Sequence, residues 1–427
     1  MLSQLKLGIL ASELRFQRFL RRLLASKYYI NFGEGVVYDT QAASKPLPKN
    51  AITKWLIREL QHCYRIHRDD SADIIEKKRY NQLLNEIESQ QRTEQVFSYP
   101  TRMSIEMTRN CNLRCRMCPQ NWLEVNKREI PESVIDAIKF LIPYQNYIAV
   151  FGFGESLTAQ HFFEYLDRLP FHNQQTVSLI TNGILLTPSV SKKIIAGPIN
   201  ELLVSIDTID AQTYTYIRQA NLLPTIIENI REFNRQRIAL HTQKPNLRLG
   251  FVAMRKNIEQ LPEFIRFAKE VDAGDVDVGY LNVFSEDFRE ESLYYFPELT
   301  ARMFKASQQL AQSLQVRLNI PELKRYQLTD DGISGSGQFN KQCLEPWQYI
   351  YINSDGTITP CCINISSLGD LTKSDFQSIW NNDKYRALRR NVNTPAEPYR
   401  CKYCFDCRYK DIKNLSHQMI VVEPGPR

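Results

Sequence analysis

Short apolar runs alternate with longer amphipathic stretches from Arg102 onward, and this alternation is the main pattern of the chain. The short runs have the length and the branched or aromatic residues of buried strands, whereas the longer stretches carry apolar residues at helical spacing. Strands that alternate with helices in this way are typical of parallel β/α units. The predicted strands are residues 104–108 (SIEMT), 148–154, 177–183, 201–207, 247–254 and 276–282, and the predicted helices begin near Pro131, His161, Pro188, Ala211 and Ile258.

The first hundred residues precede the alternating region, and we predict that residues 1–100 form a mainly helical extension. Between residues 2 and 28, leucines and phenylalanines recur at helical spacing beside basic residues that include Arg15, Arg18 and Arg22. This spacing predicts an amphipathic helix. Packing on the protein's own body is the main interpretation of this helix, and docking of an acidic peptide leader, a partner or a membrane surface is the alternative.

The C-terminal flank begins with a predicted helix and strand at residues 297–318, followed by a Gly- and Ser-rich stretch at residues 329–340. Such a stretch predicts a flexible linker. Beyond it, residues 349–362 predict a strand pair with a tight Ser-Asp-Gly turn, and residues 376–390 predict one helix. The expected division is therefore an extension at residues 1–100, a β/α region at 101–328 and a small C-terminal domain at 341–410.

Length and charge narrow the class of protein further. A chain of 427 residues exceeds the size at which one hydrophobic core is efficient, and 43% hydrophobic residues is typical of a globular protein. No uninterrupted apolar run is long enough to span a membrane, and the N-terminus lacks the apolar centre of a secretory signal. The net charge of +7 is dispersed, so it gives no indication of nucleic-acid binding. We predict a soluble cytoplasmic protein.

The chain has ten cysteines, and all except Cys63 fall into two groups with metal-type spacing, which favours a reducing compartment. In the first group, Cys111, Cys115 and Cys118 are spaced so that three thiols can converge on one metal centre. A structural zinc site requires a fourth protein ligand. A four-iron cluster held by three cysteines instead has one iron free to bind a substrate. A buried cysteine group or a zinc knuckle is the alternative interpretation.

The stretch CNLRCRMCP, residues 111–119, resembles the Cys-x3-Cys-x2-Cys loop of the radical S-adenosylmethionine (SAM) superfamily. The resemblance implies an α/β partial (β/α)6 TIM-like barrel, a 4Fe-4S cluster on the three cysteines and SAM beside it. FGFGES resembles a shortened Gly-Gly-Glu-Pro motif in which Ser156 replaces the proline. The resemblance also implies a set of SAM-binding residues. These are Met117 and Leu281 near the adenine, Gly154 and Glu155 at the amino group, Asn182 near the ribose, Ser205 as a further contact, and Arg218 at the carboxylate. For Arg218, the alternative interpretation is an exposed arginine on a helix.

The last cysteine group resembles the SPASM or Twitch extension of radical SAM enzymes, from CLEPW at Cys343 to CKYCFDC at residues 401–407. Two fully cysteine-ligated clusters need more thiols than this group contains, so one auxiliary 4Fe-4S cluster is expected. Adjacent residues on a strand point to opposite faces, so Cys361 and Cys362 are not expected to bind together. Cys362 or Cys407 can replace an assigned ligand, and a four-cysteine zinc site is the alternative. The expected ligands are Cys343, Cys361, Cys401 and Cys404.

The resemblance implies cleavage of SAM to a 5′-deoxyadenosyl radical that takes a hydrogen atom from an unactivated carbon. The basic N-terminal region favours a peptide or natural-product substrate, which would be oxidised or cross-linked with the help of the auxiliary cluster. The single auxiliary cluster also fits oxidation of an alcohol on a sugar or aminocyclitol, and a non-catalytic iron–sulfur electron carrier or scaffold is a third hypothesis. An electron donor such as flavodoxin or ferredoxin is implied, while no catalytic side chain or general base is distinguished by its pattern.

Overall fold

The computed structural model describes residues 74–121, 128–283, 286–321, 327–329, 332–334, 343–362, 366–394, 396, 398, 401 and 419–422. The predicted basic helix at residues 2–28 lies outside the described residues, and so do Cys63, Cys404 and Cys407. In the described ranges, no helix combines the length and the apolar character needed to cross a membrane.

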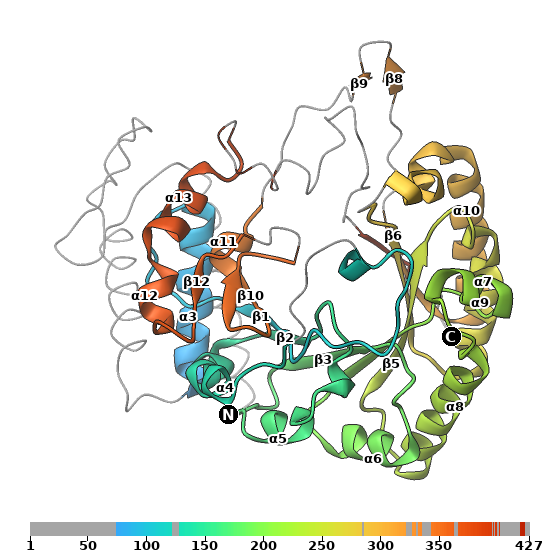
Figure 1. Ribbon diagram of the computed structural model, residues 1–427, viewed down its shortest axis with the longest axis horizontal. Coiled ribbons are helices and arrows are strands. Elements are labelled where there is room, and N and C mark those ends of the chain that lie inside the picture. The colour runs from blue at the N-terminus through green and yellow to red at the C-terminus, as the bar shows by residue number, and fades with distance from the viewer. Residues whose placement is uncertain are drawn as a thin grey trace, which may run out of the picture.

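A curved sheet organises the described chain, in the hydrogen-bonded order β12-β11-β10-β1-β2-β3-β4-β5-β6-β7-β13 (Figure 1). Neighbouring strands from β1 to β7 are parallel, which confirms the predicted α/β class and partial barrel. Each predicted strand overlaps an observed one. The strands are β1 Arg102–Ile105, β2 Tyr147–Val150, β3 Thr176–Thr181, β4 Glu201–Ser205, β5 Asn246–Ala253, β6 Asp275–Tyr280 and β7 Arg317–Pro321.

Helices cover the outer face of this curved sheet (Figure 1). Their apolar sides pack on the strands; Phe264 of α9, for example, meets Phe251 of β5 edge to face at 5.1 Å between ring centroids. Polar side chains cap the starts of two of them: Thr187 caps α6, and Asp210 accepts a hydrogen bond from Thr213 N at 2.7 Å at the start of α7. The helices are α4 Glu132–Ile138, α5 Phe162–Asp167, α6 Pro188–Ala196, α7 Ala211–Arg218, α8 Leu223–Ala239, α9 Leu261–Glu270 and α10 Pro297–Leu314, with short 3-10 turns η1 Pro119–Asn121, η2 Lys139–Tyr144, η3 Ser156–Thr158, η4 Ile258–Gln260, η5 Glu286–Glu291 and η6 Leu293–Tyr295.

The C-terminal unit continues the sheet of the barrel. Its first strand, β10, pairs in parallel with β1, so that Ile105 lies opposite Ile352. The strands β10 and β11 form the predicted antiparallel pair. We predicted a small separate domain here, and the structure adds that its strands lengthen the main sheet at the β1 edge. Its elements are α11 Glu345–Gln348, β10 Tyr349–Ile352, β11 Thr357–Thr359, β12 Gly369–Asp370, α12 Phe376–Trp380 and α13 Asp383–Asn391. The last strand, β13 Met419–Val422, instead pairs antiparallel with β7 at the opposite edge of the sheet.

Two local expectations for the C-terminal part differ from the described structure. The single helix expected at residues 376–390 is divided into α12 and α13, because Asn382 accepts a hydrogen bond from Tyr385 N at 2.9 Å and starts a new helix. Asparagine strongly favours this capping position, so the Asn-Asn pair was a readable signal. The expected linker at residues 329–340 overlaps a strand pair, β8 Gln327–Thr329 with β9 Gly332–Ser334.

The helix α3, Ile74–Gln91, falls within the predicted N-terminal extension and packs both on η2 of the barrel and on α11 of the C-terminal unit. Asn85 donates a hydrogen bond to the Trp347 carbonyl oxygen at 2.7 Å, and the Trp347 indole donates to the Thr93 carbonyl oxygen at 2.7 Å. Glu88 of the same helix is buried, and burial raises its pKa to about 7. Residues that precede the barrel in the sequence and residues that follow it thus form one hydrogen-bonded region.

Glu106, directly after β1, joins the barrel to the C-terminal unit. Its side chain is fully buried and forms an ion pair with Arg109 at 2.7 Å. The same carboxylate accepts hydrogen bonds from the hydroxyls of Ser354 and Tyr351 at 2.7 and 3.0 Å. It also accepts one from Phe153 N, in the loop after β2, at 3.3 Å. One buried carboxylate therefore holds three segments that are distant in sequence.

Replacement of Glu106 by alanine should lower the free energy of unfolding by about 3–5 kcal/mol, because it leaves the mostly buried guanidinium of Arg109 without its charged partner. Urea unfolding of the purified protein measures this loss. The control is Glu132→Ala, which removes the exposed ion pair between Glu132 and Arg168 and should cost less than about 1 kcal/mol. Equal losses in the two variants would contradict the role given to Glu106.

Candidate functional site

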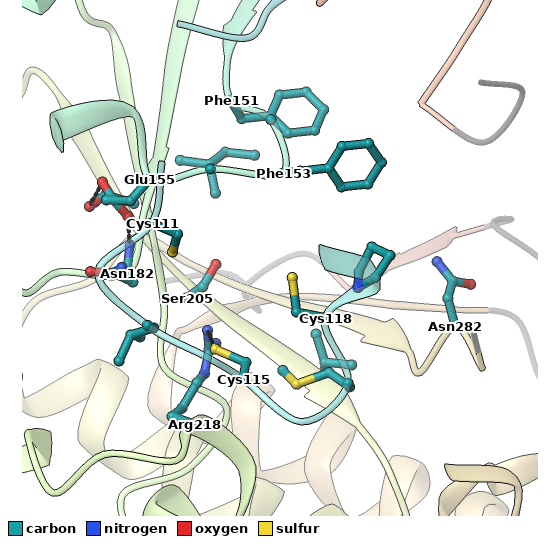
Figure 2. A pocket seen from close by; sticks show the side chains of 18 of the residues that line it. Cys111, Cys115, Cys118, Phe151, Phe153, Glu155, Asn182, Ser205, Arg218 and Asn282 are labelled. Atoms are coloured by element: carbon teal, nitrogen blue, oxygen red, sulfur yellow. Dashed lines mark hydrogen bonds between the residues drawn. The ribbon is translucent and has the colours of Figure 1, made fainter. Parts of the chain in front are cut away.

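A cavity of about 290 Å³ lies where the C-terminal ends of the parallel strands meet (Figure 2). Loops at this end of parallel barrels usually carry the chemistry. The cavity brings together every residue that the sequence predicted for the first cluster and for SAM. These lining residues are Cys111, Cys115, Cys118, Met117, Gly154, Glu155, Asn182, Ser205, Arg218 and Leu281.

The cysteine loop follows β1 and is held by its own backbone. Cys118 N donates to the Cys115 carbonyl oxygen at 3.0 Å, and the Asn121 side-chain amide donates to the same oxygen at 2.7 Å. The Arg116 amide anchors the loop to α7 by donating to the Ile217 carbonyl oxygen at 2.9 Å. These contacts fix a turn that presents the thiols to the cavity, as Figure 2 shows.

The three thiols fit an iron–sulfur cluster better than a single metal ion. Among the described residues, no three His, Cys, Asp or Glu side chains are grouped closely enough to hold one ion. A single zinc ion would have to bind all three sulfurs at about 2.3 Å, which brings the sulfurs close to one another. A four-iron cluster binds each thiolate through a different iron, so its three sulfurs can lie farther apart. Burial raises the pKa of Cys111, and it raises that of Cys118 to about 11. Bound iron would supply the positive charge that stabilises the thiolates.

The loop after β2 is pressed against the cysteine loop at Gly154. A Cβ atom at this position would lie 2.2 Å from the Thr108 carbonyl oxygen and 2.5 Å from that of Asn110, so no larger residue fits. The next residue, Glu155, donates its backbone N–H to the Asn110 carbonyl oxygen at 2.8 Å. The sequence motif FGFGES therefore forms a close backbone wall of the cavity, as a glycine-containing motif allows.

The side chain of Glu155 organises this wall from within. Its carboxylate accepts hydrogen bonds from the Thr181 hydroxyl at 2.8 Å and from Asn182 N at 2.7 Å. Burial raises the pKa of Glu155. The Asn182 side-chain amide in turn donates to the Asn112 amide oxygen at 2.6 Å, which ties the loop after β3 to the cysteine loop. The described partners of Glu155 are thus other parts of the protein.

Arg218, at the end of α7, is only 6% exposed, so the interpretation as an exposed helix arginine was wrong. Its Nη2 forms an ion pair with Asp207 Oδ2 at 2.6 Å, and its Nη1 donates to Cys115 Sγ at 3.6 Å. Burial acts to lower the pKa of Arg218, but Asp207 and Cys115 together raise it. Arg218 Nε is buried without a hydrogen-bond partner among the described residues, which fits a site that receives an anionic ligand group.

Sequence reasoning missed three polar residues that shape the site, namely Asp207, Glu106 and Gln120. Asp207 follows β4 closely and has a left-handed backbone with φ of 65°. Glu106 follows β1, and Gln120 donates hydrogen bonds to the carbonyl oxygens of Arg109 and Phe153. The signal was present for the two acids, because each is a charged residue placed at the C-terminal end of an apolar strand run.

The C-terminal thiols lie at different depths. Cys401 is buried and Cys343 is partly buried against the main hydrophobic core. Cys361 is half-buried and its neighbour Cys362 is exposed. Asn393 fixes the backbone at Cys343 by exchanging two hydrogen bonds of 2.8 and 2.9 Å with it. The fourth expected ligand, Cys404, lies outside the described residues.

Comparison with known families agrees with this geometry. A model of the radical SAM superfamily matches residues 105–268, and a model of SPASM, an iron–sulfur cluster-binding domain, matches residues 343–408. An AdoMet-dependent heme synthase from Methanosarcina barkeri is 25% identical over 337 residues, which cover 72% of this chain and 91% of that protein. A PqqA peptide cyclase from Bradyrhizobium diazoefficiens is 22% identical over 350 residues, which cover 76% of this chain and 83% of that protein.

The fold also matches solved structures. The crystal structure of SuiB from Streptococcus suis bound to S-adenosylmethionine has a TM-score of 0.56 at 15% identity, and the match covers 81% of this chain and 80% of that one. At this identity the match supports the fold alone. The family matches confirm the predicted SAM and iron–sulfur cofactors. The chain is therefore a radical SAM superfamily enzyme with a C-terminal SPASM domain.

Proposed function

We propose that the cavity holds a 4Fe-4S cluster on Cys111, Cys115 and Cys118 with SAM beside it, and that the enzyme takes a hydrogen atom from a peptide or natural-product substrate. The observation that carries the proposal is the convergence of all the predicted cofactor residues on one cavity. When bound, the reduced cluster supplies the electron that cleaves SAM, so that its 5′-carbon takes the hydrogen atom from an unactivated substrate carbon.

The residues of the chain bind and orient SAM in this proposal. The unpartnered Nε of Arg218 suits a carboxylate, because a guanidinium forms strong charge-assisted hydrogen bonds. In this arrangement the backbone around Gly154 and Glu155 would bind the amino group, Asn182 would lie near the ribose, and Ser205 would be a further contact to SAM. The apolar residues Met117 and Leu281 suit the adenine; they lie together with Ile217, Met254, Val283 and Phe288 in a small apolar cluster.

The SPASM domain has a redox role in the proposal. Cys343, Cys361, Cys401 and Cys404 would hold one auxiliary 4Fe-4S cluster, which would accept the electron that the substrate radical loses when it is oxidised to product. The parallel pairing of β10 with β1 supports this role, because the same sheet carries the cysteine loop and the strand before Cys361. The division into an N-terminal extension at residues 1–100, a radical SAM core at 101–328 and a SPASM domain at 341–410 also remains our proposal.

The choice of a peptide rests on the relatives and on one sequence feature. The PqqA peptide cyclase spans three quarters of this chain. A basic N-terminal helix with Arg15, Arg18 and Arg22 would suit an acidic leader, although it lies outside the described residues. Oxidation of an alcohol on a sugar or aminocyclitol is the second candidate, because one auxiliary cluster is sufficient for it. Flavodoxin or ferredoxin is the proposed electron donor.

Anaerobic reconstitution should give about eight irons per chain, since each of two clusters holds four. Replacing Cys111, Cys115 and Cys118 together by alanine should leave about four irons, all in the C-terminal unit. Iron analysis with Mössbauer spectroscopy measures both numbers. Cys63→Ala is the matched control and should keep about eight. Roughly twelve irons in the unmodified protein would rule out a single auxiliary cluster.

Reduced protein with SAM should form 5′-deoxyadenosine slowly even without substrate.

Arg218→Lys should weaken SAM binding at least about tenfold, because hydrogen bonds to charged groups contribute about 1.5–3 kcal/mol. Isothermal titration with SAM measures the change. The control is Arg237→Lys, since Arg237 is also buried and paired, with Asp272 at 2.9 Å, but lies outside the cavity. Equal SAM affinity in the two variants would remove Arg218 from the SAM site.

A further inference from the structure

The cavity has an aromatic wall whose residues have no assigned role in binding the cofactors. Phe151 and Phe153 line it from the loop after β2, and Figure 2 shows both rings projecting the same way from that loop. Both are half-buried, and neither belongs to a hydrophobic core cluster of the described residues. Two large apolar side chains thus face the cavity without packing into the protein's interior. Such an arrangement is typical of a surface that receives an apolar ligand.

This wall is held rigidly from behind. Phe153 N donates to the Glu106 carboxylate at 3.3 Å, and the Phe153 carbonyl oxygen accepts a hydrogen bond from the Gln120 side chain. The ring of Phe151 meets the ring of Tyr351 edge to face, with centroids 5.8 Å apart. Both peptide groups of Phe153 are therefore fixed while its ring stays available. Fixing a contact surface in advance reduces the entropy that binding must overcome.

Asn282 offers polar recognition in the same cavity. It follows β6, is half-buried and lines the same cavity, on the side away from Glu155 and Asn182 in Figure 2. Its side-chain amide has no hydrogen-bond partner among the described residues. A primary amide carries both donors and an acceptor, so it can match the N–H and C=O groups of a peptide.

Most other polar groups of the lining already have partners or a cofactor role. Glu155 is bound to Thr181 and Asn182, and Arg218 is paired with Asp207. A sugar or cyclitol carries a hydroxyl on nearly every carbon, and hydroxyls against two phenylalanine rings would lose their hydrogen bonds to water without replacement. The wall therefore favours an apolar group over a polyol.

We propose that Phe151 and Phe153 bind an apolar or aromatic side chain of a peptide substrate and that Asn282 binds a neighbouring peptide group. This inference rests on the proposed function, because it deepens the choice between a peptide and a sugar or aminocyclitol. It assigns substrate selection to the loop after β2, whose position Glu106 and Gln120 determine. Phe153 is the residue whose removal should matter most, since its backbone is held on both sides and its ring has no aromatic contact among the described residues.

The test uses three probes with cluster-loaded protein and SAM in the absence of reductant, so that no turnover occurs. The probes are acetyl-Gly-Phe-Gly-amide, acetyl-Gly-Asp-Gly-amide and myo-inositol. Saturation-transfer NMR gives the dissociation constant of each. We expect the Phe peptide to bind at least about tenfold more tightly than the other two probes, because only it can fill the apolar wall.

The variants locate this binding. Phe153→Ala should weaken binding of the Phe peptide by about tenfold, and Asn282→Ala by a smaller factor, while SAM affinity stays unchanged. The matched control Phe163→Ala removes a partly buried ring of α5 that does not line the cavity, and it should leave peptide binding intact. Preferred binding of myo-inositol, failure of the Phe peptide to bind, or unchanged peptide binding in Phe153→Ala would overturn the inference.

A second measurement distinguishes failure of this inference from failure of the proposed function. Reductant is added with a Phe peptide deuterated on its Phe side chain, and 5′-deoxyadenosine is analysed for deuterium. Formation of unlabelled 5′-deoxyadenosine together with absent peptide binding would keep the SAM-cleaving function and reject the peptide site. Loss of SAM binding by the unmodified protein would reject the proposed function itself.

Discussion

The buried carboxylate of Glu106 is the constraint on which the arrangement of the site depends. A carboxylate without contact to water is costly unless a charge and several hydrogen bonds compensate it. Here Arg109 supplies the charge, and Ser354, Tyr351 and the Phe153 amide supply the hydrogen bonds. Because these donors belong to different segments, satisfying Glu106 requires the barrel, the loop after β2 and the SPASM strand pair to be in place together.

Buried charged side chains also connect the other loops that line the cavity. Glu155 joins the loops after β2 and β3, and Arg218 joins α7 to Asp207 after β4 while facing Cys115. Each loop at the C-terminal edge is thus held by a neighbour and not by its own strand alone. Such mutual support keeps binding groups in fixed positions, which is how a protein controls a reactive cofactor.

Patterns that are local in the sequence predicted the fold well. Strand spacing gave the parallel units, and the cysteine spacing with FGFGES identified residues that all line one cavity. Pairings between distant residues were not predictable: Glu106 and Tyr351 are 245 positions apart, and no periodicity connects them. The division between α12 and α13 is different, because the capping preference of Asn382 is local and was overlooked.

The arrangement also explains why the C-terminal unit was hard to place from sequence. Its predicted strand pair has an ordinary turn and alternation, yet nothing in residues 349–362 indicates that β10 would pair with β1. Edge strands expose unpaired backbone groups, and β1 and β10 satisfy each other in this way. The SPASM domain is therefore part of the wall behind Phe151 through Tyr351.

The most direct test of the central claim is an anaerobic crystal structure of the reconstituted protein with SAM. The account predicts a four-iron cluster bound by the sulfurs of Cys111, Cys115 and Cys118, with SAM in the same cavity in contact with Gly154 and Arg218. A single zinc ion on these cysteines, or SAM bound outside the cavity, would contradict it.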